Sequence, residues 1–194
     1  HITVEEEIRR METLLPRVIA ETTVPVSVDT YRARTAEYAF QQGAHILNDI
    51  WGFHYDKELA DVAASFRVPV ILMHNQQDTK YDDIIDDMKA FFFQSIDLAE
   101  KAGVHRYNIW LDPGIGFGKN YEQNIEVIHR LDELAAFEFP ILLGPSRKRF
   151  IGTMLNDVPP SERDEGTATV CILGVLSGAD AVRVHNVKMV KRAL

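Results

Sequence analysis

Polar residues that could bind a small ligand follow several short apolar runs of this chain. Asp29, Asn48, Asp49 and Asp112 each end a segment rich in Val, Ile or Leu, and His74 ends another. Carboxylate and amide oxygens accept hydrogen bonds, so they suit a ligand that presents several N–H groups. An Asp after a strand can also simply cap the next helix, and His74 fits best as a structural His that bonds a neighbouring loop. Together these residues predict one site rich in acceptors.

Basic residues follow two further apolar runs. The segment Ser146-Arg147-Lys148-Arg149 comes directly after Gly144, and Arg183 alternates with His185 on the last predicted strand. Residues two apart on a strand point to the same side, so Arg183 and His185 are expected to share one face. Cations at a strand end suit a phosphate group or a carbonyl to be polarised, and a solvated basic patch is the alternative for residues 146–149. An anion site is therefore predicted here.

The segment 111–119, LDPGIGFGK, is the sharpest local motif. Its alternating Gly114, Gly116 and Gly118 would let the backbone approach a ligand closely, with Asp112 at the end of the preceding strand. The spacing matches neither the P-loop nor the dinucleotide-binding fingerprint. A plain glycine-rich turn remains the alternative.

The histidines show no spacing typical of a metal site. His45, His54, His105 and His129 form no H-x-x-x-H pattern, and Cys171 is the single cysteine. We therefore predict no zinc site. Cys171 lies in an apolar segment and is expected to be a small buried side chain.

The elements that must position these residues alternate regularly. Strands are expected at 24–29, 45–49, 69–74, 108–112, 140–144 and 181–185. Helices are expected at 3–20, 31–42, 56–66, 83–102, 122–136, 162–178 and from 187 to the end, with a short one starting near 147. Gly43, Gly103 and Gly178 each fall between a helix and the next strand, where a left-handed C-cap is needed.

This alternation predicts an α/β fold of the TIM (β/α)8 barrel type, with about six visible βα units. An open doubly wound sheet is the alternative, because alternation alone does not settle whether a sheet closes. Either fold binds its ligands at the C-terminal ends of the strands, where the polar residues lie. No linker or repeat divides the sequence, so residues 1–194 are expected to form a single domain.

The chain opens on a helix signal where a barrel would have a strand. Thr3 and Glu6 form the T-x-x-E pattern of a capping box. Barrels of this type usually have about 250 residues. We therefore expect the domain to be truncated or incomplete at its N-terminus.

Composition narrows the possible partners. The chain has 194 residues, 46% of them hydrophobic, with a net charge of −8. This net charge argues against a surface for nucleic acid or an anionic membrane, because such surfaces need clustered Lys and Arg. No apolar run reaches the length of a membrane span, and a single Cys fits a reducing cytoplasm.

Six ordered motifs resemble those of the dihydropteroate synthases, a family of pterin-binding TIM barrels. They are SVDT (27–30), Ile46 with Asn48-Asp49, LMHN (72–75), LDPGIGFGK (111–119), GPSRK (144–148) and RVHNV (183–187). The resemblance covers about residues 3–194. It implies a transferase of folate biosynthesis that condenses 4-aminobenzoate with a dihydropterin diphosphate, giving dihydropteroate and diphosphate.

The resemblance also implies a role for each matched position. The pterin-binding residues would be Asp29, Asn48, Met73, Asp112, Phe117, Gly144 and Lys148. Arg183 and His185 would bind the diphosphate, Ser146 and Lys148 the aminobenzoate, and Asp29 and Lys148 would be catalytic. The chain departs from the family at Asn186, where many members have Asp, and at Pro145, where Thr or Met is frequent.

Cofactor and partners follow from the same resemblance. The family uses Mg²⁺, and its metal ligand belongs to a strand that would precede residue 3, so no metal ligand is expected in this chain. The expected partners are the two substrates, sulfonamide inhibitors and a second copy in a homodimer. The expected location is the cytoplasm.

The implied reaction is substitution at the exocyclic methylene of the pterin. Arg183, His185 and Mg²⁺ would stabilise the leaving diphosphate, and Asp29 a cationic methylene. Two alternatives stay open: a catalytically incompetent pterin-binding fragment, and a barrel like the pterin-dependent methyltransferases. An unrelated phosphate-binding barrel would require the ordered motifs to be a coincidence.

Overall fold

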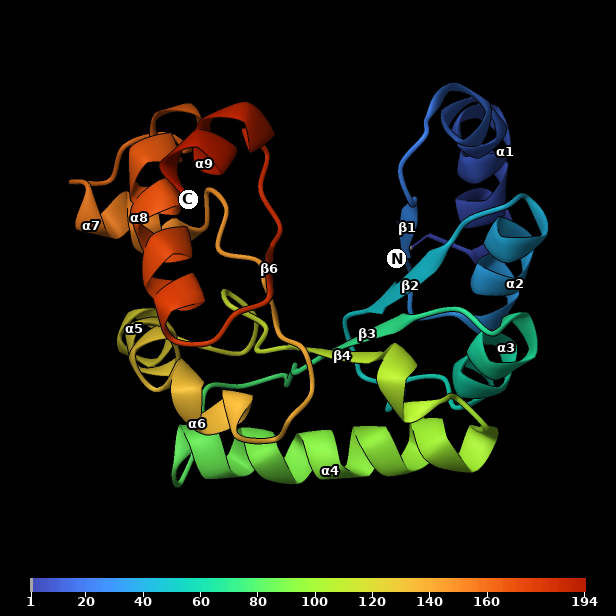
Figure 1. Ribbon diagram of the computed structural model, residues 1–194, viewed down its shortest axis with the longest axis horizontal. Helices are drawn as coiled ribbons and strands as arrows, with labels where there is room; N and C mark the ends of the chain where they lie inside the picture. The colour runs from blue at the N-terminus through green and yellow to red at the C-terminus, as the bar shows by residue number, and fades with distance from the viewer. Residues whose placement is uncertain (1) are drawn as a thin grey trace. The chain divides into compact units, whose positions relative to one another are not determined.

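The computed structural model describes residues 2–194, and the chain divides into two compact units (Figure 1). Unit 1 contains the residues up to Met73 together with Phe92–Trp110. Unit 2 contains His74–Phe91 and Leu111–Leu194. Helix α4 (Ile84–Ala102) and strand β4 (Ile109–Asp112) each contribute residues to both units.

Unit 1 is built on parallel strands taken in chain order. Strands β1 (Ser27–Asp29), β2 (Ile46–Asp49) and β3 (Val70–Met73) pair successively, and β4 follows β3 in the sheet. Their register places Asp29 opposite Asn48. The helices are α1 (Val4–Glu21), α2 (Ala33–Gln41) and α3 (Glu58–Phe66), of which α1 contacts α2 and α2 contacts α3. A short 3-10 helix η1 (Arg106–Asn108) precedes β4.

Unit 2 continues the same pattern. Leu111 forms a parallel bridge with Ile141, and β5 (Leu142–Leu143) pairs with β6 (Ala181–Val182). The helices are α5 (Tyr121–His129), α6 (Leu131–Ala135), α7 (Arg149–Met154), the 3-10 helix η2 (Pro160–Glu162), α8 (Asp164–Leu176) and α9 (Val187–Ala193). Helix α8 contacts both α5 and α9.

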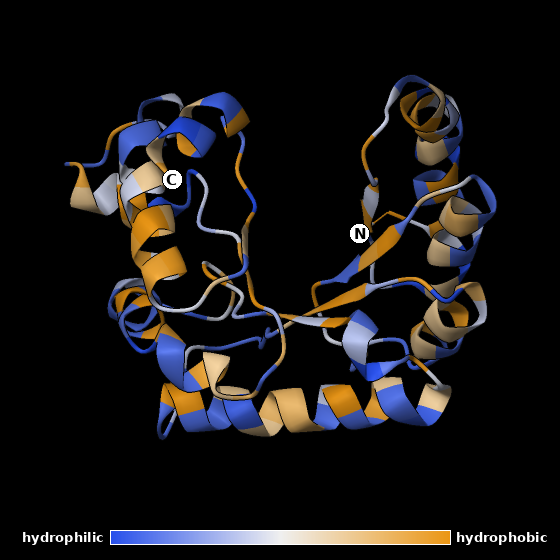
Figure 2. Ribbon diagram, in the orientation of Figure 1, coloured by the Kyte–Doolittle hydropathy of each residue, from blue (hydrophilic) through white to orange (hydrophobic). Residues whose placement is uncertain are grey.

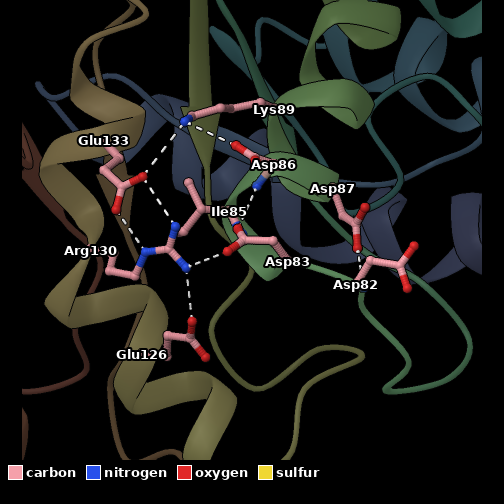
Figure 3. Close-up of polar contacts among 9 residues, drawn as sticks. All are labelled: Asp82, Asp83, Ile85, Asp86, Asp87, Lys89, Glu126, Arg130 and Glu133. Carbon is pink, nitrogen blue, oxygen red and sulfur yellow. Dashed lines mark hydrogen bonds and ion pairs between the residues drawn. The ribbon is translucent and has the colours of Figure 1, made fainter.

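The start of α4 is fastened to α5 and α6 by one arginine (Figure 3). Arg130 donates to Glu133 at 2.7 Å, and to Asp83 and Glu126 at 2.9 Å each. Lys89 adds an ion pair of 3.7 Å to Glu133. Arg130 also ends α5, with φ of −103° and ψ of 22°, so the single helix predicted at 122–136 is wrong and is in fact two.

Local sequence signals explain most element ends. Asn120 begins α5 with a complete capping box to Gln123. Thr3 accepts from the backbone of Glu6 at 3.2 Å, while the Glu6 carboxylate pairs with arginines one turn later. Gly43, Gly103 and Gly178 have φ of 95°, 98° and 101°, which confirms the predicted left-handed C-caps.

Apolar side chains of strands and helices form a core within each unit, and the apolar faces are visible in Figure 2. In unit 1, Leu47, Val70 and Leu72 are completely buried. In unit 2, Cys171 is completely buried and packs in a cluster with Ala168 and Val190. The prediction of a buried cysteine is confirmed.

The fold class is confirmed, although several strand bounds were wrong. Parallel strands in strict chain order are the arrangement of a βα barrel, whereas a doubly wound sheet reverses its order at a switch point. The described strands form a four-stranded and a two-stranded sheet. Observed strands are shorter than the predictions at 24–29, 140–144 and 181–185, because regular pairing covers only Ser27–Asp29, Leu142–Leu143 and Ala181–Val182. None of the described helices is long and apolar enough to span a bilayer.

Candidate active site

In unit 1, Asp29 ends β1, Asn48 is the penultimate residue of β2, and Met73 ends β3, one residue before the predicted end at His74. Asp29 is exposed, and it lies in register with Asn48, whose backbone carbonyl accepts from Thr30 at 3.1 Å. Asn48 is only 2% exposed and Met73 3%. The register therefore brings Asp29 and Asn48 together at the C-terminal edge of the sheet.

The side chain of Asn48 is unusual for a buried amide. Its Nδ2 and Oδ1 atoms have no hydrogen-bond partner among residues 2–194. Buried polar groups are nearly always paired, because an unsatisfied one loses its bonds to water without replacement. The amide of Asn48 therefore has both a donor and an acceptor available for a ligand.

Asp49, the next residue, has a structural role. Its two carboxylate oxygens accept from the backbone N–H groups of Trp51 at 2.9 Å and Phe53 at 2.7 Å. Burial raises the pKa of Asp49 to about 6, although these two bonds act in the opposite direction. Its acceptors are thus occupied by the turn that follows β2, at which Phe53 has φ of 68°.

In unit 2 the end of β4 carries Asp112, which is 5% exposed. Its Oδ1 accepts from the N–H of Gly114 at 2.7 Å. Burial raises the pKa of Asp112 to about 6, opposed first by the Gly114 bond and then by the charges of Lys119, Lys148 and Arg183. A buried carboxylate in a field of three cations is well suited to accept from a ligand with N–H donors.

Gly144, at the end of β5, lies beside this carboxylate. A Cβ added to Gly144 would be 3.8 Å from Oδ2 of Asp112 and 4.0 Å from the Cβ of Arg183. The predicted residues Asp112, Gly144 and Arg183 are therefore neighbours in unit 2.

The glycine-rich loop after β4 needs its glycines. Gly114, Gly116 and Gly118 have φ of 68°, 83° and 55°. A Cβ on Gly118 would lie 2.7 Å from the backbone oxygen of Gln76, and a Cβ on Gly116 would lie 2.9 Å from Cδ of Lys148. The interpretation of 111–119 as a close-approach loop is supported by these values, since no L side chain fits without strain.

This loop brings Phe117 next to Lys148. The Lys148 ammonium lies 4.1 Å from the centre of the Phe117 ring, a cation–π contact. Lys148 is the N-cap of α7, and both side chains are half-buried. An aromatic face and an ammonium group are thus offered side by side.

The segment 146–148 is held by the start of α8. Arg147 has φ of 57°, a left-handed conformation that costs a non-glycine residue about 1–3 kcal/mol. Its guanidinium binds Asp164 through two bonds of 2.8 and 3.1 Å, and its carbonyl accepts from Arg163 at 3.0 Å. The bond to Arg147 is the main cause of the lowered pKa of Asp164, about 2. The side chain of Arg147 therefore stabilises the loop conformation, and its neighbours Ser146 and Lys148 are not used in these bonds.

Arg183 and His185 follow β6 and are both exposed, while Val184 between them is half-buried. The predicted alternation is therefore observed, although the strand ends at Val182. Nδ1 of His185 lies 2.8 Å from Oγ of Ser146, and the His185 backbone N–H donates to the same oxygen at 3.1 Å. The structure thus places Ser146 against His185.

Several residues of this region had no role in the sequence interpretation. Lys119, Arg163 and Asp164 are the main ones, together with Tyr81, whose hydroxyl donates to the carbonyl of Gly118 at 2.7 Å. Lys119 ends the LDPGIGFGK motif, and that position was the available signal. His74 contacts Lys119 at 2.9 Å, which confirms the prediction of a structural His that bonds a neighbouring loop.

The described residues offer no ligand set for a metal. Within residues 2–194, no group of three or more His, Cys, Asp or Glu side chains could hold a metal ion. Asp49 and Asp112 instead accept from backbone amides, and Asp112 also lies among cations. These residues therefore do not fit the magnesium ion that the resemblance implies.

Comparisons with known proteins point to one enzyme family. The sequence pattern of the family described as pterin binding enzyme matches residues 1–185. A dihydropteroate synthase of Bacillus subtilis (strain 168) is 47% identical over 192 residues, which are 98% of this chain and 67% of that protein. A dihydropteroate synthase of Clostridium beijerinckii is 46% identical over 193 residues, which are 99% of this chain and 71% of that protein.

Solved structures give the same result. A dihydropteroate synthase from Clostridium difficile, crystallised in the presence of pteroic acid, superposes with a TM-score of 0.97 at 45% identity, covering 100% of this chain and 73% of that one. The Yersinia pestis enzyme in a sulfonamide drug complex gives a TM-score of 0.94 at 34% identity, covering 100% and 72%.

Proposed function

The chain belongs to the dihydropteroate synthase family of pterin-binding enzymes, and from this premise we propose the role of each residue in the site. The family's reaction joins 4-aminobenzoate to the methylene carbon of a dihydropterin diphosphate and releases diphosphate. The observation that carries the residue assignment is the unpartnered, buried amide of Asn48 at the end of β2.

In unit 1, Asn48 and Asp29 bind the edge of the pterin ring. A 2-amino-4-oxo pterin has N–H donors and ring acceptors, and the Asn48 amide supplies both partners. Asp29, in register with Asn48, supplies a carboxylate that also stabilises positive charge as it develops on the methylene. Met73, at the end of β3, supplies an apolar contact to the flat ring.

In unit 2, Asp112 accepts from the pterin N–H groups. Its charge is kept in a buried setting by the Gly114 bond and by nearby cations. Gly144 leaves room for a flat ring beside the carboxylate, and Phe117 offers an aromatic face. Lys148, within 4.1 Å of the Phe117 ring, contacts both the pterin and the aminobenzoate.

The charged ends of the two substrates are bound by Arg183, His185 and Ser146. Arg183 and His185 are exposed on one side of the chain after β6 and bind the diphosphate, so they stabilise the negative charge that accumulates as it leaves. Ser146, bonded to His185, lies toward the aminobenzoate carboxylate. The aromatic amine then attacks the methylene as a neutral nucleophile.

Three further expectations belong to this proposal. Mg²⁺ would add positive charge at the diphosphate, but none of its ligands is assigned to this chain. Sulfonamides, which one relative binds in its crystal structure, are proposed to occupy the aminobenzoate side. A homodimer in the cytoplasm stays a prediction from the family.

The proposal is tested by direct turnover. The protein is mixed with dihydropterin diphosphate, 4-aminobenzoate and Mg²⁺, and the release of diphosphate and formation of dihydropteroate are followed. Turnover that depends on both substrates is the expected result. Pterin binding without turnover would identify a non-catalytic pterin-binding chain, and absence of binding would refute the residue assignment.

A further inference from the structure

Lys119 is a buried lysine to which none of the substrate contacts proposed above is assigned. It is 9% exposed and ends the glycine-rich loop after β4. Its ammonium nitrogen lies 3.2 Å from the carbonyl of Gly114, 3.0 Å from the carbonyl of Phe117 and 2.9 Å from Nδ1 of His74. An ammonium group has three N–H donors, so these contacts use all of them.

This geometry determines the state of His74. When Lys119 is charged it has no acceptor, so Nδ1 of His74 must accept and the ring proton must be on Nε2. His74 is 2% exposed and contacts the ring of Phe91 edge-on, with ring centres 4.9 Å apart. The imidazole is therefore a fixed acceptor against which the lysine is held.

Other side chains also form hydrogen bonds to the backbone of the glycine-rich loop after β4. Asn124 accepts from the N–H of Gly116 at 2.6 Å, and Tyr81 donates to the carbonyl of Gly118 at 2.7 Å. The carbonyl of Phe117 is held by Lys119. The backbone from which the Phe117 ring projects thus depends directly on the Lys119 ammonium.

We propose that Lys119 is a positioning residue for pterin binding: its ammonium group holds the loop in the conformation that presents the Phe117 ring beside Lys148. The inference rests on the proposed function, because it takes Phe117 and Lys148 to be pterin contacts. Lys119 does not itself touch the substrate in this scheme.

The proposal has a consequence for pH. Burial lowers the pKa of Lys119 from 10.5 to about 7, although the charge of Asp112 acts against this. The other titratable or charged groups around the loop are His74 after β3, Tyr81 in the segment before α4, and Lys148 at α7. Loss of the proton weakens both carbonyl bonds, since charge-assisted hydrogen bonds are roughly twice as strong as neutral ones. Pterin affinity should therefore fall as the pH rises through about 7.

Calorimetry with pteroic acid and, separately, inorganic diphosphate tests this on the whole chain at pH 6.5 and pH 8.5. The variants are Lys119→Met, which removes every donor, and Lys119→Gln, which keeps uncharged donors. Lys101→Met removes an exposed lysine that pairs with Asp97 at 2.7 Å and serves as the control. We expect Lys119→Met to bind pteroic acid about tenfold more weakly at pH 6.5, with unchanged diphosphate affinity.

The pH profile separates positioning from a general structural defect. The unmodified chain and Lys101→Met should lose pteroic acid affinity between the two pH values, whereas Lys119→Gln should show a smaller affinity that does not change with pH. If Lys119→Met does not fold, the pH dependence of pteroic acid affinity in Lys119→Gln decides the question. If the unmodified protein binds pteroic acid and the Lys119 variants bind it equally well, with the same change of affinity between the two pH values, the role of Lys119 is refuted while the proposed function stands. Unmodified protein that binds no pteroic acid would overturn the proposed function and this role with it.

Discussion

Replacing Asn48 with Leu should have opposite effects on stability and on binding. Leu has nearly the shape of Asn but no polar atoms. In the free protein both polar atoms of the Asn48 side chain are buried without a partner, at 2% exposure. A buried unsatisfied polar group costs roughly 1–3 kcal/mol, so Asn48→Leu should raise the free energy of unfolding by about that amount.

Binding should weaken over a similar range. The amide is proposed to make two hydrogen bonds to the pterin, each worth about 0.5–1.5 kcal/mol net. Their loss, about 1–3 kcal/mol, corresponds to an affinity roughly 5- to 150-fold weaker. Urea unfolding gives the stability, and calorimetry with pteroic acid gives the affinity.

Asn124→Leu provides a matched control for the stability measurement. Asn124 is also buried, at 3% exposure, but its amide accepts from Gly116 at 2.6 Å and donates to the carbonyl of Asn120 at 2.6 Å. The same substitution there should destabilise the protein, because it leaves backbone groups unpaired. If Asn48→Leu also destabilises the protein and leaves pteroic acid affinity unchanged, the reasoning that reserves this amide for a ligand is refuted.

Three other substitutions probe the rest of the site. Asp112→Asn should weaken pteroic acid binding by about 1.5–3 kcal/mol. Because the pKa of Asp112 is raised from 3.8 to about 6 in the folded protein, the free energy of unfolding of the unmodified protein should fall as the pH rises from about 4 to about 6. Urea melts of the Asn variant should lack this part of the pH dependence. Arg183→Ala or His185→Ala should weaken the pterin diphosphate far more than the pterin alcohol, and equal losses in a competition assay would place the anion elsewhere. Gly118→Ala should lower the free energy of unfolding by about 1–3 kcal/mol, since φ is 55° and the new Cβ meets the Gln76 backbone at 2.7 Å; an unchanged urea midpoint would contradict the close-approach loop.

The sequence predicted best those features that a single residue type marks, such as a polar residue at a strand end or a glycine at a turn. A polar residue that ends an apolar run predicted the strand ends at Asp29, Asp49 and Asp112, because a buried parallel strand is apolar along most of its length and becomes polar where it ends. Glycines between a helix and the next strand predicted the left-handed C-caps at Gly43, Gly103 and Gly178. The parallel α/β fold followed from the same regularities.

Other features depend on contacts between distant residues and could not be read from spacing. Lys119 looks like any loop lysine in the sequence, and only the fold brings His74, 45 residues away, to its ammonium. The helix break at Arg130 was hidden because apolar residues recur every three positions on both sides of it, at Ile125, Ile128, Leu131 and Leu134, while the backbone departs from helical geometry at Arg130. The short β5 and β6 were overestimated, since apolar content does not reveal where pairing stops.

The link between Asn186 and Asp164 constrains how this site can vary among relatives. Asn186 donates from Nδ2 to Oδ2 of Asp164 at 2.9 Å, and the same carboxylate holds Arg147 in its left-handed conformation. An Asp at position 186 would bring a second carboxylate against the first, and the repulsion would compete with the Arg147 bond. Relatives with Asp at the equivalent of 186 should therefore have exchanged the partner at 164 or moved its carboxylate, so the two positions form a coupled pair in which one change selects for the other.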